Sequence, residues 1–240
     1  MKRSYIKNIK NIMENNENLK EELIRIQERL IPYISDDFIS EGEIKNIAGV
    51  DLAYWKKEGK EYAVCCIVVL NYRTLDIIEK VDYMGEVECP YIPGCLAFRE
   101  IPLFIEANKK LKSPIDLYFF DGNGYLHPRH MGLATQAGIV IKRPTIGVAK
   151  KYYKIENTDY VPPAYEKYAF TDIMIKGTRY GRAIRTQKEC KPIFLSVGNM
   201  IDLETATRIT KSLIKGESRL PIPIRFADIE THKMRKRYIL

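Results

Sequence analysis

The chain has 240 residues and 45% of them are hydrophobic, which suits one domain of ordinary size with a full core. A net charge of +8 and an isoelectric point near 9.1 favour nucleic acid or an anionic membrane as a partner, although a solvated, lysine-rich surface would give the same charge. Five cysteines without a CxxC spacing argue against a disulfide framework and a cysteine zinc site. Reduced cysteines, no apolar run of roughly 18 residues and no signal-peptide core predict a cytoplasmic protein without a membrane span.

The first part of the chain predicts one helix and three strands. Apolar residues at helical spacing predict an amphipathic helix over residues 7–31, which Pro32 ends. Strands are expected at about 46–54, 61–71 and 75–84. Because the turns between these strands are short and polar, the strands should form an antiparallel meander.

The rest of the chain alternates strands with helices. We expect a helix over 96–111 with a kink or a late start at Pro102, then a strand over 115–120, a helix near 131–142 and a strand over 145–149. A hairpin over 166–176 and 179–186 should follow, with its turn at Gly177. The chain should end with a strand over 192–197, a helix over 202–215 and a basic, helical tail over 225–240. Strand–helix–strand order implies parallel pairing with right-handed crossovers. The predicted fold class is therefore α/β, a ribonuclease H-like mixed sheet (an antiparallel meander plus parallel strands) with helices on both faces, in a single domain of residues 1–240.

Two carboxylates interrupt apolar strands. Asp121 ends the strand over 115–120, and Asp51 lies inside the strand over 46–54. If these strands are neighbours, the two carboxylates could share a divalent cation at the sheet edge, with Glu100 as a third acid. A turn former would explain Asp121 and a solvated helix residue would explain Glu100, but a buried, unpaired Asp51 would be strongly destabilising.

Several other residues could contact nucleic acid at this edge. The stiff loop Pro90–Gly94 could push Tyr91 and Ile92 into a base stack, or it could simply connect a strand to a helix. Four glycines could let the backbone approach a flipped base, or could be ordinary turn and strand glycines; they are Gly94, Gly122, Gly124 and Gly147.

Basic residues and histidines give weaker indications. Lys150 ends a strand, where it could stabilise charge developing on a phosphate or could be solvated. His127 could pack beneath the Asp121 loop or contact substrate, because it makes a poor zinc site with His130 alone. Four basic clusters could line a nucleic-acid groove, although each alone is expected to be solvated: Lys142–Arg143, Lys150–Lys151, Arg179/Arg182/Arg185 and Lys233–Arg237.

Several of these motifs, in this order, resemble the endonuclease V family. The matching segments are Ala48–Asp51, Pro90–Gly94 with Phe98–Glu100, Asp121–Gly124 with His127–Arg129, Gly147–Lys150 and Ser218–Asp228. The resemblance covers residues 40–230, and the helix before residue 40 has no assigned role. It implies a ribonuclease H-like nuclease that depends on Mg²⁺, with Mn²⁺ as a substitute, and acts on inosine in nucleic acid.

The resemblance also implies roles for individual residues. Asp51 and Asp121 resemble the metal ligands, Glu100 the third acid at the metal or its water, and Lys150 the catalytic lysine. Tyr91 resembles a wedge that fills the gap left by a flipped base. The expected nucleic-acid contacts are this wedge with its loop neighbours Pro90, Ile92 and Pro93, a backbone-rich lesion pocket of Gly94, Leu96, Gly122 and Gly147, and also Gly124 and His127. Cys95 stands where a bulkier apolar residue is common. Asp228 matches a position that carries either His or Asp, so its part in metal binding stays open.

The leading prediction is a monomeric DNA repair endonuclease. By resemblance, it would cut the second phosphodiester bond 3′ to deoxyinosine and leave 3′-hydroxyl and 5′-phosphate ends. An endoribonuclease for inosine-containing RNA is the alternative within the same class, because the motifs do not decide which sugar the substrate carries. A non-catalytic inosine-binding protein and a junction resolvase are the alternatives from other classes.

Overall fold

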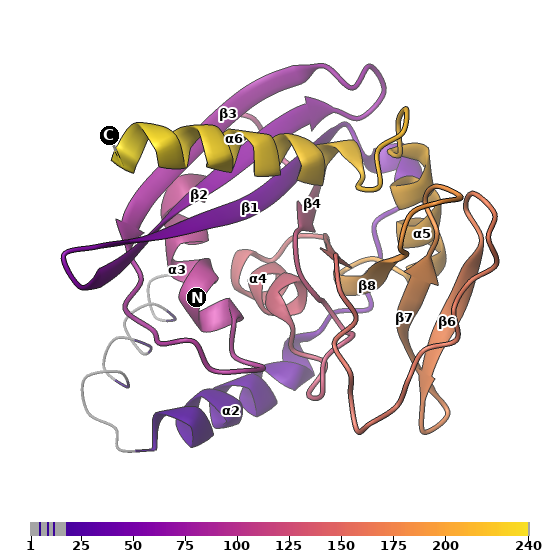
Figure 1. Cartoon of the computed structure of the whole chain (residues 1–240), viewed down its shortest axis with the longest axis horizontal. Helices are drawn as coiled ribbons and strands as arrows, with labels where there is room; N and C mark the ends of the chain where they lie inside the picture. Colours follow the sequence, from indigo (N-terminus) through magenta and orange to yellow (C-terminus); the bar gives the residue numbers. More distant parts are fainter. Residues whose placement is uncertain (1–4, 6–8, 10–11, 13–17, 240) are drawn as a thin grey trace.

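The computed structural model describes residues 5, 9, 12 and 18–239, and the strands of this part form one mixed sheet of eight (Figure 1). The strands are β1 (Asn46–Lys57), β2 (Lys60–Asn71), β3 (Ile77–Glu86), β4 (Leu117–Phe120), β5 (Thr145–Ala149), β6 (Phe170–Ile175), β7 (Thr178–Ile184) and β8 (Ile193–Asn199). Their order across the sheet is β3-β2-β1-β4-β5-β8-β7-β6.

The pairing of the strands confirms the predicted meander and the predicted parallel strands. β1 and β2 pair antiparallel, as do β2 and β3. β4 lies parallel to β1, and β5 lies parallel to β4. The hairpin of β6 and β7 turns at Gly177, and β8 lies antiparallel between β5 and β7. The mixed sheet of the ribonuclease H-like plan is thus present.

Helices cover both faces of the sheet, as expected. They are α2 (Leu19–Leu30), α3 (Ala97–Asn108), α4 (Leu133–Ile141), α5 (Leu203–Ser212) and α6 (Ile222–Ile239), with short 3₁₀ turns at Ile31–Tyr33 and Glu41–Glu43. One apolar core lies between the sheet and α3 and α4, with Leu23 of α2 at its edge. A second core lies on the opposite face under α5 and the start of α6. Because both faces are covered, all four residues of β4 and all five of β5 are buried.

Several predicted boundaries are wrong. Much of the helix expected over 7–31 lies outside the described residues, and α2 begins only at Leu19, after a turn at Asn18. Pro102 neither delays nor ends α3, which begins at Ala97 and continues past it. Helix α5 begins at Leu203 because the Asp202 side chain accepts a hydrogen bond from the Thr205 backbone at 2.8 Å.

No helix in the described part of the chain is both long and apolar enough to cross a membrane.

Helix α6 packs unusually close to β1, and glycine makes this possible. A Cβ atom on Gly49 would lie 1.9 Å from the carbonyl oxygen of Pro223 in the first turn of α6. Further along β1, Ala53 packs against Met234 of α6. Small residues on this side of β1 therefore let α6 pack closely on the strand. Figure 1 shows α6, in yellow, lying over β1 and β2.

The contact at Gly49 gives a first prediction. Gly49→Ala should lower the free energy of unfolding by about 1–3 kcal/mol, because α6 must move away from β1 to accommodate the methyl group. Urea denaturation measures this change. The matched control is Gly42→Ala, whose new Cβ would meet only Ser40 Oγ at 3.7 Å. Equal denaturation midpoints for the two variants would contradict the role given to Gly49.

Candidate active site

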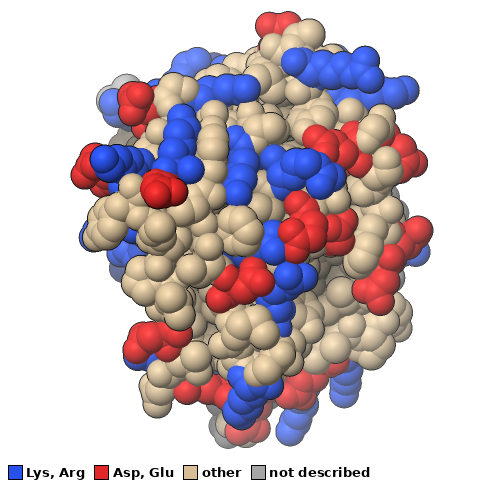
Figure 2. Space-filling model, turned by 90° about the vertical axis from the view of Figure 1, so that its right-hand side faces the viewer, with Lys and Arg blue, Asp and Glu red and all other residues tan. Residues whose placement is uncertain are grey.

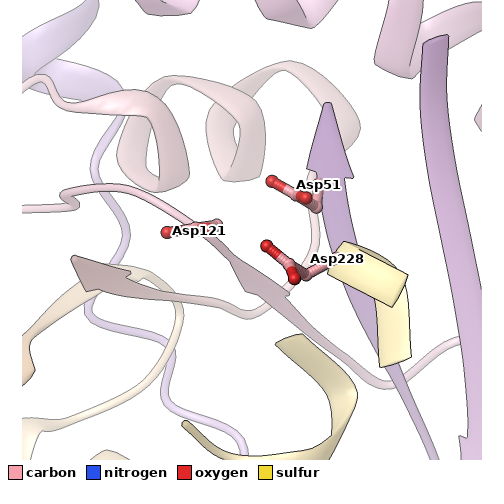
Figure 3. A group of neighbouring side chains, drawn as sticks. All are labelled: Asp51, Asp121 and Asp228. Atoms are coloured by element: carbon pink, nitrogen blue, oxygen red, sulfur yellow. The ribbon is translucent and has the colours of Figure 1, made fainter. Parts of the chain in front are cut away.

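Three carboxylates from three different elements meet at the carboxyl edge of β4. Asp51 lies on β1, Asp121 follows β4, and Asp228 lies on α6. Each offers an oxygen within 4.8 Å of the oxygens of the other two. Figure 3 shows the Asp51 and Asp228 side chains directed toward the side of the view where Asp121 lies. The structure thus brings together Asp51 and Asp121, as the sequence predicted, and it adds Asp228, whose part was left open.

Lys150 bridges two of these carboxylates. Its Nζ lies 2.6 Å from Asp121 Oδ2 and 2.9 Å from Asp228 Oδ1. Burial alone would lower the pKa of Lys150, but hydrogen bonds and charge attraction from Asp121 and Asp228 outweigh burial and raise it. The main chain is held as well, since Arg219 Nη2 donates to the Lys150 carbonyl at 2.6 Å. Lys150 therefore stays protonated and fixed at the end of β5.

Asp51 is the most strongly perturbed of the three carboxylates. Burial, followed by the charge of Asp121, raises its pKa to about 7. The hydroxyl of Thr231 lies 3.0 Å from Asp51 Oδ2 and 2.9 Å from the carbonyl oxygen of Asp228. Thr231, one turn after Asp228 on α6, therefore ties the helix to the carboxylate on the strand.

Glu100 lies outside this group of three. It is buried in the first turn of α3, where the Tyr54 hydroxyl donates to Glu100 Oε1 at 2.8 Å. Burial raises its pKa to about 8, with further contributions from the charges of Asp51 and Asp121. The charges of Asp51 and Asp121 thus act on Glu100 as well, and its role as a metal ligand stays a prediction.

The donor set fits a hard divalent cation. The group of Asp51, Asp121 and Asp228 contains only carboxylate oxygens, which Mg²⁺ and similar ions prefer, and no histidine or cysteine ligand. A cation here would also offset both the burial and the repulsion by Asp121 that raise the pKa of Asp51. These residues could therefore hold a divalent metal ion.

A small cavity of about 100 Å³ opens between the Pro90–Gly94 loop and the loop that follows β4. Four residues predicted to contact nucleic acid line it: Tyr91, Gly94, Leu96 and His127. The sequence did not single out the others, which are Gln27, Ala97, Asn123, Met131, Gly132, Leu133 and Tyr153.

Three predicted glycines do not line this cavity but support the loop beside it. A Cβ on Gly147 would lie 2.4 Å from the backbone nitrogen of Gly124, and a Cβ on Gly124 would lie 2.2 Å from the carbonyl oxygen of Val197. Gly122 packs against Leu133, with its Cβ position 3.2 Å from the Leu133 side chain. These glycines let the loop after β4 lie directly on β5 and β8, and any contact of theirs with nucleic acid stays a prediction.

The cavity wall at Gly94 is tightly held. The Gly94 carbonyl oxygen accepts hydrogen bonds from Gln27 Nε2 and Arg129 Nη2, each at 3.0 Å, and His127 Nε2 lies at the same distance. Burial and the neighbouring Arg129 lower the pKa of His127 to about 4, so its ring is neutral near pH 7. Gln27 belongs to α2, so the N-terminal helix, which had no assigned role, helps to build this cavity.

Asn123 lines the same cavity and has a buried polar atom. Its Oδ1 has no hydrogen-bond partner among the described residues. Because a buried polar atom without a partner is destabilising by about 1–3 kcal/mol, a ligand that paired with Asn123 would gain from the contact. The sequence offered one indication that Asn123 belongs to this site, which is its position between Gly122 and Gly124.

The loop Pro90–Gly94 presents Tyr91 to solvent. The Tyr91 side chain is 70% exposed, whereas Cys89 and Cys95 at the two ends of the loop are buried. Arg99 holds the base of the loop, because its Nη1 donates to the Cys89 carbonyl at 2.7 Å and its guanidinium lies 6.0 Å from the Tyr91 ring. An exposed aromatic ring on an anchored loop can act as a wedge.

One of the predicted basic clusters is neutralised. Arg182 pairs with Asp172 at 2.7 Å and with Glu204 at 2.8 Å, and Arg179 contacts the same two carboxylates. Arg185 donates to backbone carbonyls. On this side of the molecule, over β6, β7 and α5, basic and acidic side chains are interspersed (Figure 2). These arginines stabilise the fold and do not offer a free basic groove.

Comparison with known proteins agrees with these features. The family model for endonuclease V matches residues 28–229. Endonuclease V of Bacillus thuringiensis subsp. konkukian is 55% identical over 221 residues, which cover 91% of this chain and 94% of that protein. Endonuclease V of Bacillus subtilis is 56% identical over 195 residues, 81% of this chain and 82% of that protein.

Solved structures are similar over nearly the whole chain. The crystal structure of Bacillus subtilis endonuclease V has a TM-score of 0.89 at 50% identity and covers 94% of this chain and 95% of that one. Endonuclease V of Ciona intestinalis, in complex with a 24mer DNA containing an inosine followed by a ribo-adenosine, has a TM-score of 0.80 at 29% identity and covers 92% of this chain and 100% of that one. The chain therefore belongs to the endonuclease V family of nucleases.

Proposed function

We propose that this protein is a DNA repair endonuclease that cuts the second phosphodiester bond 3′ to deoxyinosine. The observation that carries the proposal is the convergence of Asp51, Asp121 and Asp228 within 4.8 Å, with Lys150 bridging two of them. A small cavity with an unpartnered polar atom and an exposed tyrosine beside it support a nucleobase as the recognised group. The inosine-containing DNA bound by the Ciona relative favours deoxyinosine.

The reaction is hydrolysis of a phosphodiester. The oxygen of water forms a bond to phosphorus, the bond from phosphorus to the 3′ oxygen breaks, and that oxygen takes a proton. The products are the proposed 3′-hydroxyl and 5′-phosphate ends. Mg²⁺, with Mn²⁺ as a substitute, would make a water molecule more acidic and offset negative charge at phosphorus when bound.

The side chains have distinct parts in this chemistry. Asp51, Asp121 and Asp228 would hold the cation through their oxygens, and Glu100 would supply a further carboxylate that Tyr54 orients. The ammonium group of Lys150, protonated because its pKa is raised, offsets negative charge that develops on the phosphate.

The cavity would hold the flipped base. Gly94, Leu96 and His127 line it, and the neutral ring of His127 suits an uncharged base. Tyr91 would fill the gap left in the stack, on a loop stiffened by Pro90 and Pro93 with Ile92 between them. We further propose that the protein acts as a monomer in the cytoplasm, which sedimentation velocity and cell fractionation would test.

Removal of one carboxylate tests the cation site. Asp121→Asn should slow nicking of deoxyinosine duplex DNA on the order of 100-fold, because the cation and Lys150 both lose a partner. In a separate assay without DNA, Mg²⁺ at about 100 times its dissociation constant should raise the stability of the unchanged protein by about 2.7 kcal/mol, and this effect should be lost in the variant. Asp76→Asn, at an exposed turn, is the matched control. Full activity of Asp121→Asn with Mg²⁺ would refute the assigned site.

The unpartnered oxygen of Asn123 gives a prediction about base recognition. Hypoxanthine has an N1–H donor and an O6 acceptor, whereas the purine base of nebularine lacks both. The unchanged protein should cut a deoxyinosine duplex about tenfold faster than a deoxynebularine duplex, which corresponds to one buried hydrogen bond of about 1.4 kcal/mol. Asn123→Ala should remove most of this preference and leave the nebularine rate nearly unchanged. Equal slowing on both substrates would instead indicate that Asn123 does not read the base.

The sugar of the substrate distinguishes the proposed function from the alternative. Matched strands that carry deoxyribose or ribose around the inosine differ locally in the 2′-hydroxyl. We expect faster cutting of the deoxyribose strand in single-turnover assays. Faster cutting of the ribose strand would make the protein an inosine-specific endoribonuclease.

A further inference from the structure

The strand and the helix that carry two of the active-site carboxylates both continue past the site. β1 pairs with β4 only as far as Val50, so β1 from Asp51 to Lys57 has β2 on one side and an unpaired edge on the other. Helix α6 follows it, because Met234 packs on Ala53. Figure 1 shows the β1–β2 hairpin and α6 extending together away from β4.

An aromatic groove lies on this projection. Tyr54, Trp55, Arg235, Lys236 and Ile239 line it, and its volume is about 390 Å³. The ring of Trp55 stacks between two tyrosines, at 6.0 Å from Tyr62 and 6.4 Å from Tyr238. Because β1 has no partner here, Arg235 reaches its free edge and lies 3.5 Å from the Tyr54 carbonyl oxygen.

The basic residues around the groove are free of carboxylate partners. Lys57 at the end of β1 and Arg235, Lys236 and Arg237 on α6 form no ion pair with any carboxylate of the described residues; we call these four residues and Trp55 the β1–α6 surface. The acidic groups nearby are Glu86 and Glu230, both paired with lysines, Glu61, which lies opposite Lys56 in the β1–β2 ladder and pairs with Arg99, Asp82, which accepts from Tyr238, and the exposed Glu58 at the hairpin tip.

Unpaired charge distinguishes the β1–α6 surface from the cluster on β7. Arg179 and Arg182 have already neutralised Asp172 and Glu204, so a phosphate would have to displace a carboxylate there. Around the groove a phosphate meets free ammonium and guanidinium groups, and binding there releases counterions without breaking ion pairs.

We propose that the β1–α6 surface binds the phosphate backbone of the substrate duplex a few base pairs from the scissile bond, an inference that rests on the proposed function. Trp55 lies four residues along β1 from Asp51 and Lys57 lies six, so at about 3.3 Å per residue they are roughly 13 and 20 Å away. At about 3.4 Å per base-pair step, these distances correspond to roughly four to six steps of duplex. A duplex that places a phosphate at the carboxylates and runs toward the hairpin tip follows the open edge of β1.

Aromatic and basic residues together can also bind anionic membranes, but continuity with the active site favours nucleic acid. The open edge of β1 begins at Asp51. A straight duplex that lies at the three carboxylates can therefore continue along this edge to the groove. A membrane has no equivalent reason to adjoin the three carboxylates, whereas the proposed reaction places a phosphodiester of the duplex there.

Trp55 is the single tryptophan of the chain, so its emission reports on this surface directly. Titration with a deoxyinosine duplex in EDTA, which prevents cutting, should change the emission in a saturable way. A gel-shift assay under the same conditions gives the binding constant independently. Saturable binding without any change in Trp55 emission would overturn the proposal, as would an equal change caused by phosphatidylserine vesicles.

Charge reversal tests the contribution of the basic residues. Lys57→Glu with Lys236→Glu should weaken duplex binding on the order of 10- to 100-fold and reduce the slope of log K against log salt by about 2, as expected for two lost phosphate contacts. Lys45→Glu with Arg73→Glu is the matched control, because it makes the same charge change at exposed positions near the opposite ends of β1 and β2. Equal weakening by both pairs would show that only the net charge matters and would overturn the proposal.

The outcome separates this inference from the proposed function. Cutting at deoxyinosine that is equally sensitive to both charge-reversal pairs would leave the function standing and remove the β1–α6 surface. A second outcome would support the surface and refute the function. In it, Lys57→Glu with Lys236→Glu selectively loses duplex binding, and the unchanged protein cuts no DNA in Mg²⁺.

Discussion

The structure depends on the repulsion among three carboxylates that the fold forces together. Asp51, Asp121 and Asp228 come from β1, the end of β4 and α6, and their oxygens lie within 4.8 Å of one another. Such a cluster is unstable without compensating positive charge, and Lys150 supplies only one such charge, shared between Asp121 and Asp228. Asp51 has no such partner among the described residues, and burial together with the charge of Asp121 raises its pKa to about 7. The uncompensated negative charge lowers the stability of the fold locally, at the place where a cation would bind.

The rest of the fold holds this cluster in place. Gly49 lets the first turn of α6 contact β1, and Thr231 joins α6 to Asp51 one turn beyond Asp228. Gly147 and Gly124 do the equivalent for the loop that carries Asp121, because their missing side chains let it rest on β5 and β8. Close backbone contacts, which only glycine permits, thus fix the carboxylates on both sides of the site.

The sequence predicted the sheet and the meeting of Asp51 with Asp121, because both depend on local patterns. Apolar runs that end in Asp121 and Lys150 mark strand ends, and strand ends meet at one edge. The sequence could not predict contacts made between distant elements. Nothing in the sequence singled out Gln27, and only the folded chain shows it buried against the Gly94 carbonyl. Gly122 and Gly147 were expected in the lesion pocket and Gly124 at a nucleic-acid contact. A glycine that allows a backbone contact within the protein cannot be distinguished in sequence from one that allows contact with a ligand.

The position of free positive charge on the surface is also set by contacts between distant elements, so the sequence could not predict it. The net charge of +8 favours an anionic partner, but it cannot say which basic residues are available to bind one. Arg182 is buried between Asp172 and Glu204, so its charge is already used within the fold. Lys236, on the helix that also carries Asp228, forms no such pair among the described residues. Because an exposed ion pair must be broken before either partner can bind a phosphate, the pattern of pairing, rather than the density of basic residues, determines where a duplex can lie. That pattern favours the open edge of β1.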